Sequence, residues 1–202
     1  MGNDHTFRMI LLAGFLIVAP IGIYHRARSQ GTREKLDRRQ EGLFILLTLR
    51  PLGVAIWFGL IAYIIKPAWM TWASVPLPGW LRWTGTCLGL STGLLLIWTL
   101  RSLGKNLTDT VVTRREHTLV TSGPYRWVRH PFYSSAALAI IAASLIAANW
   151  FLLAAGGLVF LLLVIRTTRE EEHLIARFGD AYRKYMKRTG RFLPRILQLS
   201  RG

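Results

Sequence analysis

The sequence predicts an all-α, polytopic integral membrane protein with about five transmembrane helices, the last two of which form a hairpin. Three observations lead to this fold class. Of the 202 residues, 51% are hydrophobic, and they gather in long apolar blocks. The formal net charge is nevertheless +16, and most basic residues lie in the connectors between these blocks. Basic connectors alternate with weakly charged ones, as expected for a chain that crosses a membrane several times.

Three apolar blocks in the first half each predict one spanning helix, since about 20 apolar residues cross a bilayer. The first extends from about residue 7 to 24, and Arg8 near its end can extend its charge to the headgroups. No clear small-residue cleavage site follows, so we interpret it as a retained span and not as a signal peptide. The second extends from about 43 to 65 and the third from about 81 to 100. The loop 66–80, rich in proline and tryptophan, predicts an interfacial aromatic belt.

The apolar run 134–165 is too long for one ordinary span at about 1.5 Å per residue. Asn149 and Trp150 lie at its middle and offer a point of reversal. The run therefore predicts two short helices that form a tight hairpin inside the membrane.

The distribution of Lys and Arg predicts the orientation. Connectors 25–41 and 101–130 and the C-terminal tail are basic, whereas the N-terminus and loop 66–80 hold little positive charge. The positive-inside rule then places the N-terminus outside and the C-terminus in the cytoplasm, in what we expect to be a bacterial inner membrane. An anionic membrane surface accounts for this charge, so we expect no nucleic-acid partner. The single cysteine, Cys87, excludes an internal disulfide, and we expect no metal site.

The first motif is the stretch 123–133, Gly-Pro-Tyr-Arg-Trp-Val-Arg-His-Pro-Phe-Tyr. Each proline fixes its own φ and disfavours helix in the residue before it. We therefore expect a defined non-helical shape at the membrane boundary, with Arg126, Arg129 and His130 available to a polar ligand. The alternative interpretation is a basic, aromatic anchor that holds a helix end at the headgroups.

The second motif begins at the end of the last apolar block with Arg-Thr-Thr-Arg-Glu-Glu-Glu-His-Leu, residues 166–174. A continued helix places Arg166 and Glu170 one turn apart on the same face. Gly179 can end this helix, and Tyr182 and Tyr185 then share one face of the next. A self-paired helix end and simple aromatic packing are the alternative interpretations of these residues.

In this order, the two motifs resemble the isoprenylcysteine carboxyl methyltransferase family, whose wider superfamily includes phospholipid N-methyltransferases. The resemblance extends over roughly 100–194, including Leu103-Gly104-Lys105-Asn106 and Leu119-Val120-Thr121-Ser122, and is weak over the first two spans. It implies one membrane methyltransferase domain, 1–202. Within it, 1–100 would form three spans and 101–202 the cofactor-binding and catalytic half.

The resemblance also implies S-adenosylmethionine as the cofactor and S-adenosylhomocysteine as the product, bound at the cytoplasmic face. The polar catalytic pair falls on Arg166 with Glu170 or Glu171, and the run of three glutamates leaves that choice open. The positions that resemble cofactor-contacting ones are Leu119, Val120, Gly123, Pro124, Tyr125, Arg126, His130, Pro131, Tyr133, Tyr182 and Tyr185.

These side chains suit that cofactor chemically. An arginine fork binds a carboxylate, a glutamate accepts from an ammonium or from ribose hydroxyls, and aromatic faces lie well against adenine or a sulfonium. His130 can donate to a cofactor oxygen or hold a turn together. The sequence contains no glycine-rich strand-to-helix loop, so we expect no soluble-type dinucleotide fold.

The expected acceptor is lipophilic, reaches the enzyme through the bilayer, and carries an isoprenoid or prenylcysteine-like carboxylate. Such a carboxylate is already ionised at pH 7, so Arg166 is expected to orient it or the cofactor and not to accept a proton. An amine acceptor of a phospholipid N-methyltransferase would instead need a base. Two further functions compatible with the sequence are a non-catalytic membrane protein that binds anionic lipid and a membrane reductase that uses a nicotinamide cofactor.

Arg50 stands about a third of the way into the second span, beside Pro51. A charge at that depth is costly and usually faces a partner or a cavity. We expect it to bind an acidic group of the substrate or to pair with one of the glutamates. Extension of its side chain to the cytoplasmic interface is the equal alternative.

Overall fold

The computed structural model describes residues 2–30, 43–104 and 118–195, and these form a helical bundle with no β-strand among them. Its elements are α1 (Gly2–Gln30), α2 (Leu43–Ile65), the 3₁₀ helix η2 (Pro67–Ala73), α3 (Gly79–Leu103), the 3₁₀ helix η4 (Gly123–Arg126), α4 (Pro131–Ala147), α5 (Trp150–Phe178) and α6 (Asp180–Arg188). The predicted all-α fold class is confirmed.

The predicted spans correspond to α1 to α5, with two differences. Four helices among the described residues are long and apolar enough to cross a membrane, and α4 is a shorter apolar helix of 17 residues. The hairpin reverses at Ala148 and Asn149, one residue before the predicted pair Asn149 and Trp150. Its second helix is not short, however. α5 has 29 residues, about 44 Å at 1.5 Å per residue, and continues beyond the apolar run into the charged sequence that follows it.

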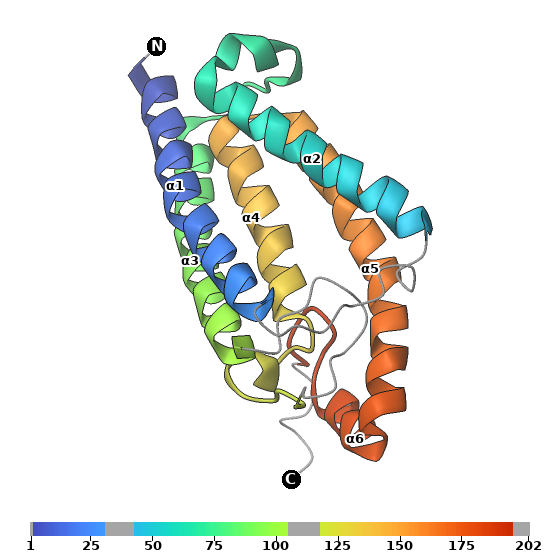
Figure 1. Ribbon diagram of the computed structural model, residues 1–202. Helices are drawn as coiled ribbons and strands as arrows, with labels where there is room; N and C mark the ends of the chain where they lie inside the picture. Colours follow the sequence, from blue (N-terminus) through green and yellow to red (C-terminus); the bar gives the residue numbers. More distant parts are fainter. Residues whose placement is uncertain (1, 31–42, 105–117, 196–202) are drawn as a thin grey trace.

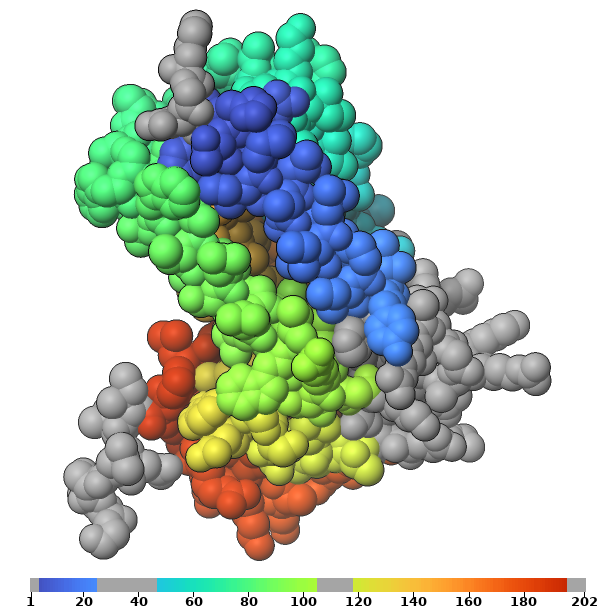
Figure 2. All heavy atoms as spheres, turned by 90° about the vertical axis from the view of Figure 1, so that its left-hand side faces the viewer, coloured from blue at the N-terminus to red at the C-terminus, as the bar shows by residue number. Residues whose placement is uncertain are grey.

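The helices alternate in direction, so the bundle has two distinct ends (Figure 1). The N-terminus, η2 and the turn between α4 and α5 lie at one end. The end of α3, η4, the start of α4 and α6 lie at the other. Figure 2 shows α1 and α3 side by side across one face, with η4 and α6 at the end away from the N-terminus. This arrangement agrees with the alternation of charge along the sequence.

Small residues let α4 pack closely against both of its neighbours. A Cβ on Gly85 of α3 would lie 2.7 Å from the Cβ of Leu145, and one on Gly156 of α5 would meet Ile140. Within a lipid bilayer the hydrophobic effect does not drive helices together, so helices associate by packing closely at small residues. α4 is therefore held between α3 and α5, and its first residues take a fixed position at the end of the bundle.

The stretch 123–133 differs in part from the expected non-helical shape. Gly123, with φ of 60°, starts a single 3₁₀ turn that includes Pro124 and Tyr125. The three residues after this turn lead to His130, which has φ of −123° and lies directly before the first residue of α4, Pro131. Proline at the first helical position needs no amide partner, so α4 can begin there without a lost hydrogen bond. The prediction was wrong for 123–126, which form this turn, and for 131–133, which belong to α4, and it holds only for 127–130.

The turn of the hairpin generates a stability prediction. Ala148 adopts a left-handed conformation with φ of 49°, and the Asn149 side chain accepts a hydrogen bond of 3.1 Å from the amide of Leu152. Ala148→Gly should stabilise the protein by up to about 1 kcal/mol because glycine adopts positive φ without strain. Asn149→Ala should destabilise it by about 1 kcal/mol because the cap is lost. Thermal unfolding in detergent measures both, and shifts of the same sign would contradict the assignment of the turn.

Candidate active site

A short backbone pairing builds the site by joining the segment before α4 to the segment after α6. The amide of Arg129 donates to the carbonyl of Gly190 at 2.8 Å, and the amide of Gly190 donates to Trp127 at 3.1 Å. The amide of His130 donates to the carbonyl of Arg191 at 3.0 Å. The two segments run parallel for this short length, so the side chains of Arg129, His130 and Arg191 lie beside the same part of α5.

Three cationic or polar side chains converge on Glu171. One carboxylate oxygen accepts from Nε of Arg129 at 2.7 Å and lies 3.2 Å from Nε2 of His130. The other accepts from Nε and Nη2 of Arg191 at 3.1 and 2.5 Å. The Glu171 side chain is only 4% exposed. We call Glu171, Arg129, His130 and Arg191 the Glu171 cluster. Both oxygens of Glu171 have fixed donors, so this carboxylate is not placed to accept a proton from a substrate.

Arg129 also binds two backbone carbonyls at the C-terminal end of α6 and directly after it. Its Nη1 donates to the carbonyl of Thr189 at 2.5 Å and to that of Met186 at 3.3 Å. The expectation that Arg129 is available to a ligand is therefore wrong, because its guanidinium is used to hold the C-terminal segment in place.

Glu170 has a different environment from Glu171. One of its oxygens accepts a hydrogen bond of 3.0 Å from the hydroxyl of Tyr133, and the residue is half-buried. The Tyr133 ring stacks on the imidazole of His130, with centroids 5.6 Å apart and an interplanar angle of 11°. The positive charge of Arg166, one turn before Glu170, acts on the Tyr133 hydroxyl. Arg166, Tyr133 and Glu170 thus form a second polar group, directly beside the Glu171 cluster.

Glu172 is exposed on the next position of α5. Of the three glutamates between which the sequence did not choose, one is enclosed by cations, one lies beside Arg166 and Tyr133, and one faces outward. Glu170 is therefore the carboxylate best placed to meet a ligand.

Tyr125 of the segment 123–130 lies against Tyr185 of α6, and Tyr182 lies beside Tyr185. The hydroxyl of Tyr185 donates to the carbonyl of Tyr125 at 2.6 Å, and the rings of Tyr182 and Tyr185 are 5.8 Å apart. Burial raises the pKa of Tyr185 to about 12, and it raises that of Tyr125 further. Burial, with the charge of Glu171 added, also raises the pKa of Tyr182. All three therefore remain neutral phenols near pH 7 and can serve as hydrogen-bond donors.

Tyr182 is 1% exposed, and its hydroxyl finds no hydrogen-bond partner among the described residues. A buried hydroxyl without a partner costs free energy, and such a group often marks a place where a ligand or a water binds.

Not every predicted residue joins the site. The predicted residues that lie at this end of the bundle are Gly123, Pro124, Tyr125, His130, Pro131, Tyr133, Arg166, Glu170, Glu171, Tyr182 and Tyr185. Leu119 and Val120 are half-buried in the segment that leads to η4. Arg126 is exposed and lies over the ring of Trp127 at 4.6 Å, as an interfacial anchor would. Lys105 and Asn106 of the motif lie outside the described residues.

Arg50 is exposed on α2 and makes no hydrogen bond or ion pair with the part of the chain that the structure describes. The expected pairing with a glutamate is therefore not present. Contact of Arg50 with a substrate stays a prediction.

The sequence analysis missed Arg191 as a part of the site and gave Arg129 the wrong role. The only signal for either was a basic residue near a motif, and nothing local links residue 191 to 171. A search for cations able to neutralise three adjacent glutamates would have drawn attention to both.

The fold and the site together define a class, namely a polytopic helical membrane protein with a polar, mixed-charge site at the open end of a helical hairpin. The family model described as the isoprenylcysteine carboxyl methyltransferase family matches residues 85–176, which contain the hairpin and all three glutamates. The solved structure of a eukaryotic intramembrane Ras methyltransferase, an isoprenylcysteine carboxyl methyltransferase, shares the fold. It is 21% identical, with a TM-score of 0.59, and the match covers 93% of this chain and 67% of that one. No curated protein sequence matches the chain.

The match over 85–176 shows that this part of the chain is similar to the isoprenylcysteine carboxyl methyltransferase family, and the solved structure shows that the fold is shared. The resemblance seen in the sequence is thereby confirmed.

The Glu171 cluster generates a prediction with a matched control one residue away. Glu171→Gln should lower the free energy of unfolding by about 2 kcal/mol or more, because it leaves two guanidiniums without a counter-charge in a largely buried place. Glu172→Gln makes the same change at an exposed position and should alter stability by less than about 0.5 kcal/mol. Thermal unfolding of the purified proteins compares the two, and equal effects would mean that the cluster does not hold this end of the bundle together.

Proposed function

We propose that the protein transfers a methyl group from S-adenosylmethionine to the carboxylate of a lipophilic acceptor, an isoprenoid or prenylcysteine-like carboxylate, at the end of the bundle that carries the Glu171 cluster. The single observation that carries the proposal is the group formed by Arg166, Tyr133 and Glu170, which lies where the apolar part of α5 ends. An acceptor in the bilayer would present a polar head at that level.

The residues at this end fit the cofactor. The hydroxyl of Tyr182, without a partner among the described residues, offers a buried donor. A carboxylate accepts about four hydrogen bonds, so Glu170, which accepts one from Tyr133, retains capacity for an ammonium or for ribose hydroxyls. The rings of His130 and Tyr133 stack on each other beside it. Bound here, S-adenosylmethionine would supply an electrophilic methyl group on a positively charged sulfur.

Arg166 would orient the acceptor carboxylate, or that of the cofactor, through its planar fork of donors. The acceptor carboxylate is ionised near pH 7 and needs no base. Transfer of the methyl group that S-adenosylmethionine would supply to this carboxylate would leave a methyl ester and S-adenosylhomocysteine. The task of the protein is then to align the two reactants and to exclude water.

An N-methyltransferase is the second candidate because an amine acceptor needs a base, and the half-buried carboxylate of Glu170 is not enclosed by cations as Glu171 is. Membranes that contain the protein, supplied with cofactor carrying a radiolabelled methyl group, separate the two. Label in the lipid fraction that is released by mild alkali indicates an ester, whereas an N-methyl group resists this treatment. The non-catalytic alternative instead predicts no saturable binding of S-adenosylhomocysteine in calorimetry.

The proposal includes the arrangement of the chain as one domain in a bacterial inner membrane. The site would face the cytoplasm, where S-adenosylmethionine is available. The basic connectors support this orientation through the positive-inside rule.

Substitution of adjacent glutamates provides the sharpest test of the proposed site. Glu170→Gln should lower kcat/KM about 100-fold, since a charge-assisted contact worth about 2–3 kcal/mol is lost. Glu172→Gln, on the exposed face, should stay within about twofold of the parent protein. The readout is base-labile label per unit of folded protein. Equal losses in the two variants would contradict the role given to Glu170.

A further inference from the structure

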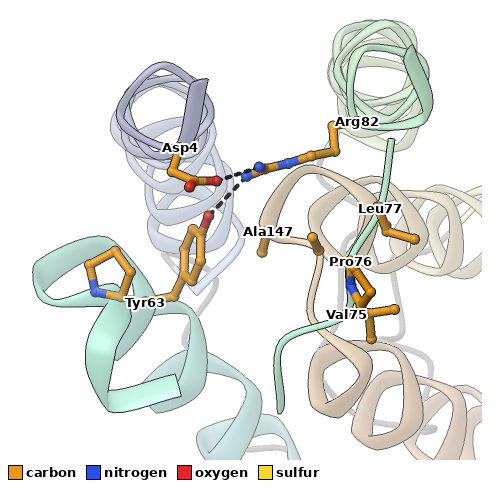
Figure 3. Close-up of a pocket in the computed structure, with 9 residues that line it drawn as sticks. Asp4, Tyr63, Val75, Pro76, Leu77, Arg82 and Ala147 are labelled. Atoms are coloured by element: carbon orange, nitrogen blue, oxygen red, sulfur yellow. Dashed lines mark hydrogen bonds and ion pairs between the residues drawn. The ribbon is translucent and has the colours of Figure 1, made fainter. Parts of the chain in front are cut away.

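A second group of polar side chains lies at the opposite end of the bundle, beside the N-terminus and the hairpin turn. It lines an open cavity of about 310 Å³. Asp4, Tyr63 and Arg82 form its polar wall, and Val75, Pro76 and Leu77 contribute to its apolar wall (Figure 3). We call it the Arg82 cavity. The volume is at the lower end of the range for small-ligand sites.

Arg82 is 7% exposed although it belongs to the first turn of a candidate membrane span. Nε donates to the carbonyl of Ile146 at 3.0 Å, Nη1 to Asp4 at 2.5 Å and Nη2 to the hydroxyl of Tyr63 at 3.3 Å. A guanidinium has five N–H donors, so two remain beyond these contacts. A buried arginine within a membrane span commonly marks a functional site, and this one has donors left over.

Asp4 and Tyr63 supply the other two polar groups of the cavity, one a negatively charged acceptor and the other a hydroxyl group. The Asp4 side chain is 68% exposed and accepts from Arg82 through Oδ1. A carboxylate has two acceptor oxygens, so Asp4 retains capacity to accept from a cation. The Tyr63 hydroxyl accepts from Arg82 and retains its own proton to donate. The cavity therefore offers donors for an anion and, next to them, an acceptor for a cation.

The position of the cavity indicates a ligand from the membrane. Four exposed tryptophans, Trp69, Trp72, Trp80 and Trp83, lie on η2 and on the start of α3, at the same end of the bundle. Tryptophan at this density marks the depth of the lipid headgroups. A headgroup would thus reach the polar wall while its glycerol backbone and chains stay against apolar surface.

We propose that the Arg82 cavity binds the zwitterionic headgroup of a phospholipid that carries a primary ammonium. The phosphate oxygens accept from Arg82 and Tyr63, and the ammonium donates to Asp4. The site lies at the other end of the bundle from the Glu171 cluster and is independent of methyl transfer.

The test uses the full chain, purified in detergent, and native mass spectrometry to measure bound lipid. The probes are dioleoyl phosphatidylethanolamine and dioleoyl phosphatidylglycerol, which share their chains and differ in the ammonium. We expect about tenfold tighter binding of the ethanolamine lipid, and loss of that preference in Asp4→Asn. Asp180→Asn is the matched control, since it removes an equal charge from an exposed ion pair at the other end. It should leave the preference unchanged.

Tyr63→Phe is a second variant, which keeps the ring and should weaken both lipids about threefold. Equal affinity for the two lipids, or an unchanged preference in Asp4→Asn, would overturn the proposal. Soluble phosphoethanolamine should compete only weakly. If it binds as tightly as the lipid, the ligand is a soluble molecule, and if inorganic phosphate competes equally well, the site recognises an anion only. Either result also overturns the assignment.

Discussion

Glu171 is the residue on which the arrangement of the candidate site depends. Three chain segments meet at its carboxylate: the residues before α4, α5 itself, and the residues after α6. Removing such a charge from water costs several kcal/mol, and only closely placed opposite charges and donors offset that cost. Two guanidiniums and an imidazole supply them here. Electrostatic contacts therefore help to hold the C-terminal segment beside α4 and α5.

The contacts of Glu171 with these cations also determine which of its neighbours can take part in chemistry. A carboxylate with both oxygens occupied is a structural group, and this leaves Glu170, with Tyr133 and Arg166 beside it, as the polar group for chemistry. Adjacent positions on a helix point about 100° apart, so two consecutive glutamates cannot serve the same cavity in the same way. The run of three glutamates thus contains one residue for stability, one for the proposed site and one for the surface.

Much of the fold could be predicted from the sequence because its causes are local. Apolar length, basic flanks and a polar pair at 149–150 predicted the spans, their alternation and the reversal of the hairpin. The roles of Arg129 and Arg191 could not be predicted, because they depend on the pairing of 127–130 with 190–191 across α5 and α6. The pair Asp4 and Arg82 was missed for the same reason, since 78 positions separate its members. The description of the hairpin as two short helices counted only the apolar run, whereas the continuation of the helix through the second motif to its end at Gly179 agrees with α5.

The hairpin sets the register of the Glu171 cluster. α4 has 17 residues and is about 26 Å long, so it carries His130 to the level that α5 reaches near Glu171, starting from the same turn at Ala148 and Asn149. Gly85 and Gly156 allow α4 to lie close to its neighbours, because a side chain at either position would clash with α4. One residue added to or removed from either arm would rotate the remainder by about 100° and turn the carboxylate away from the imidazole. The position of the Glu171 cluster at one end of the bundle therefore depends on the turn at the other end and on the lengths of α4 and α5.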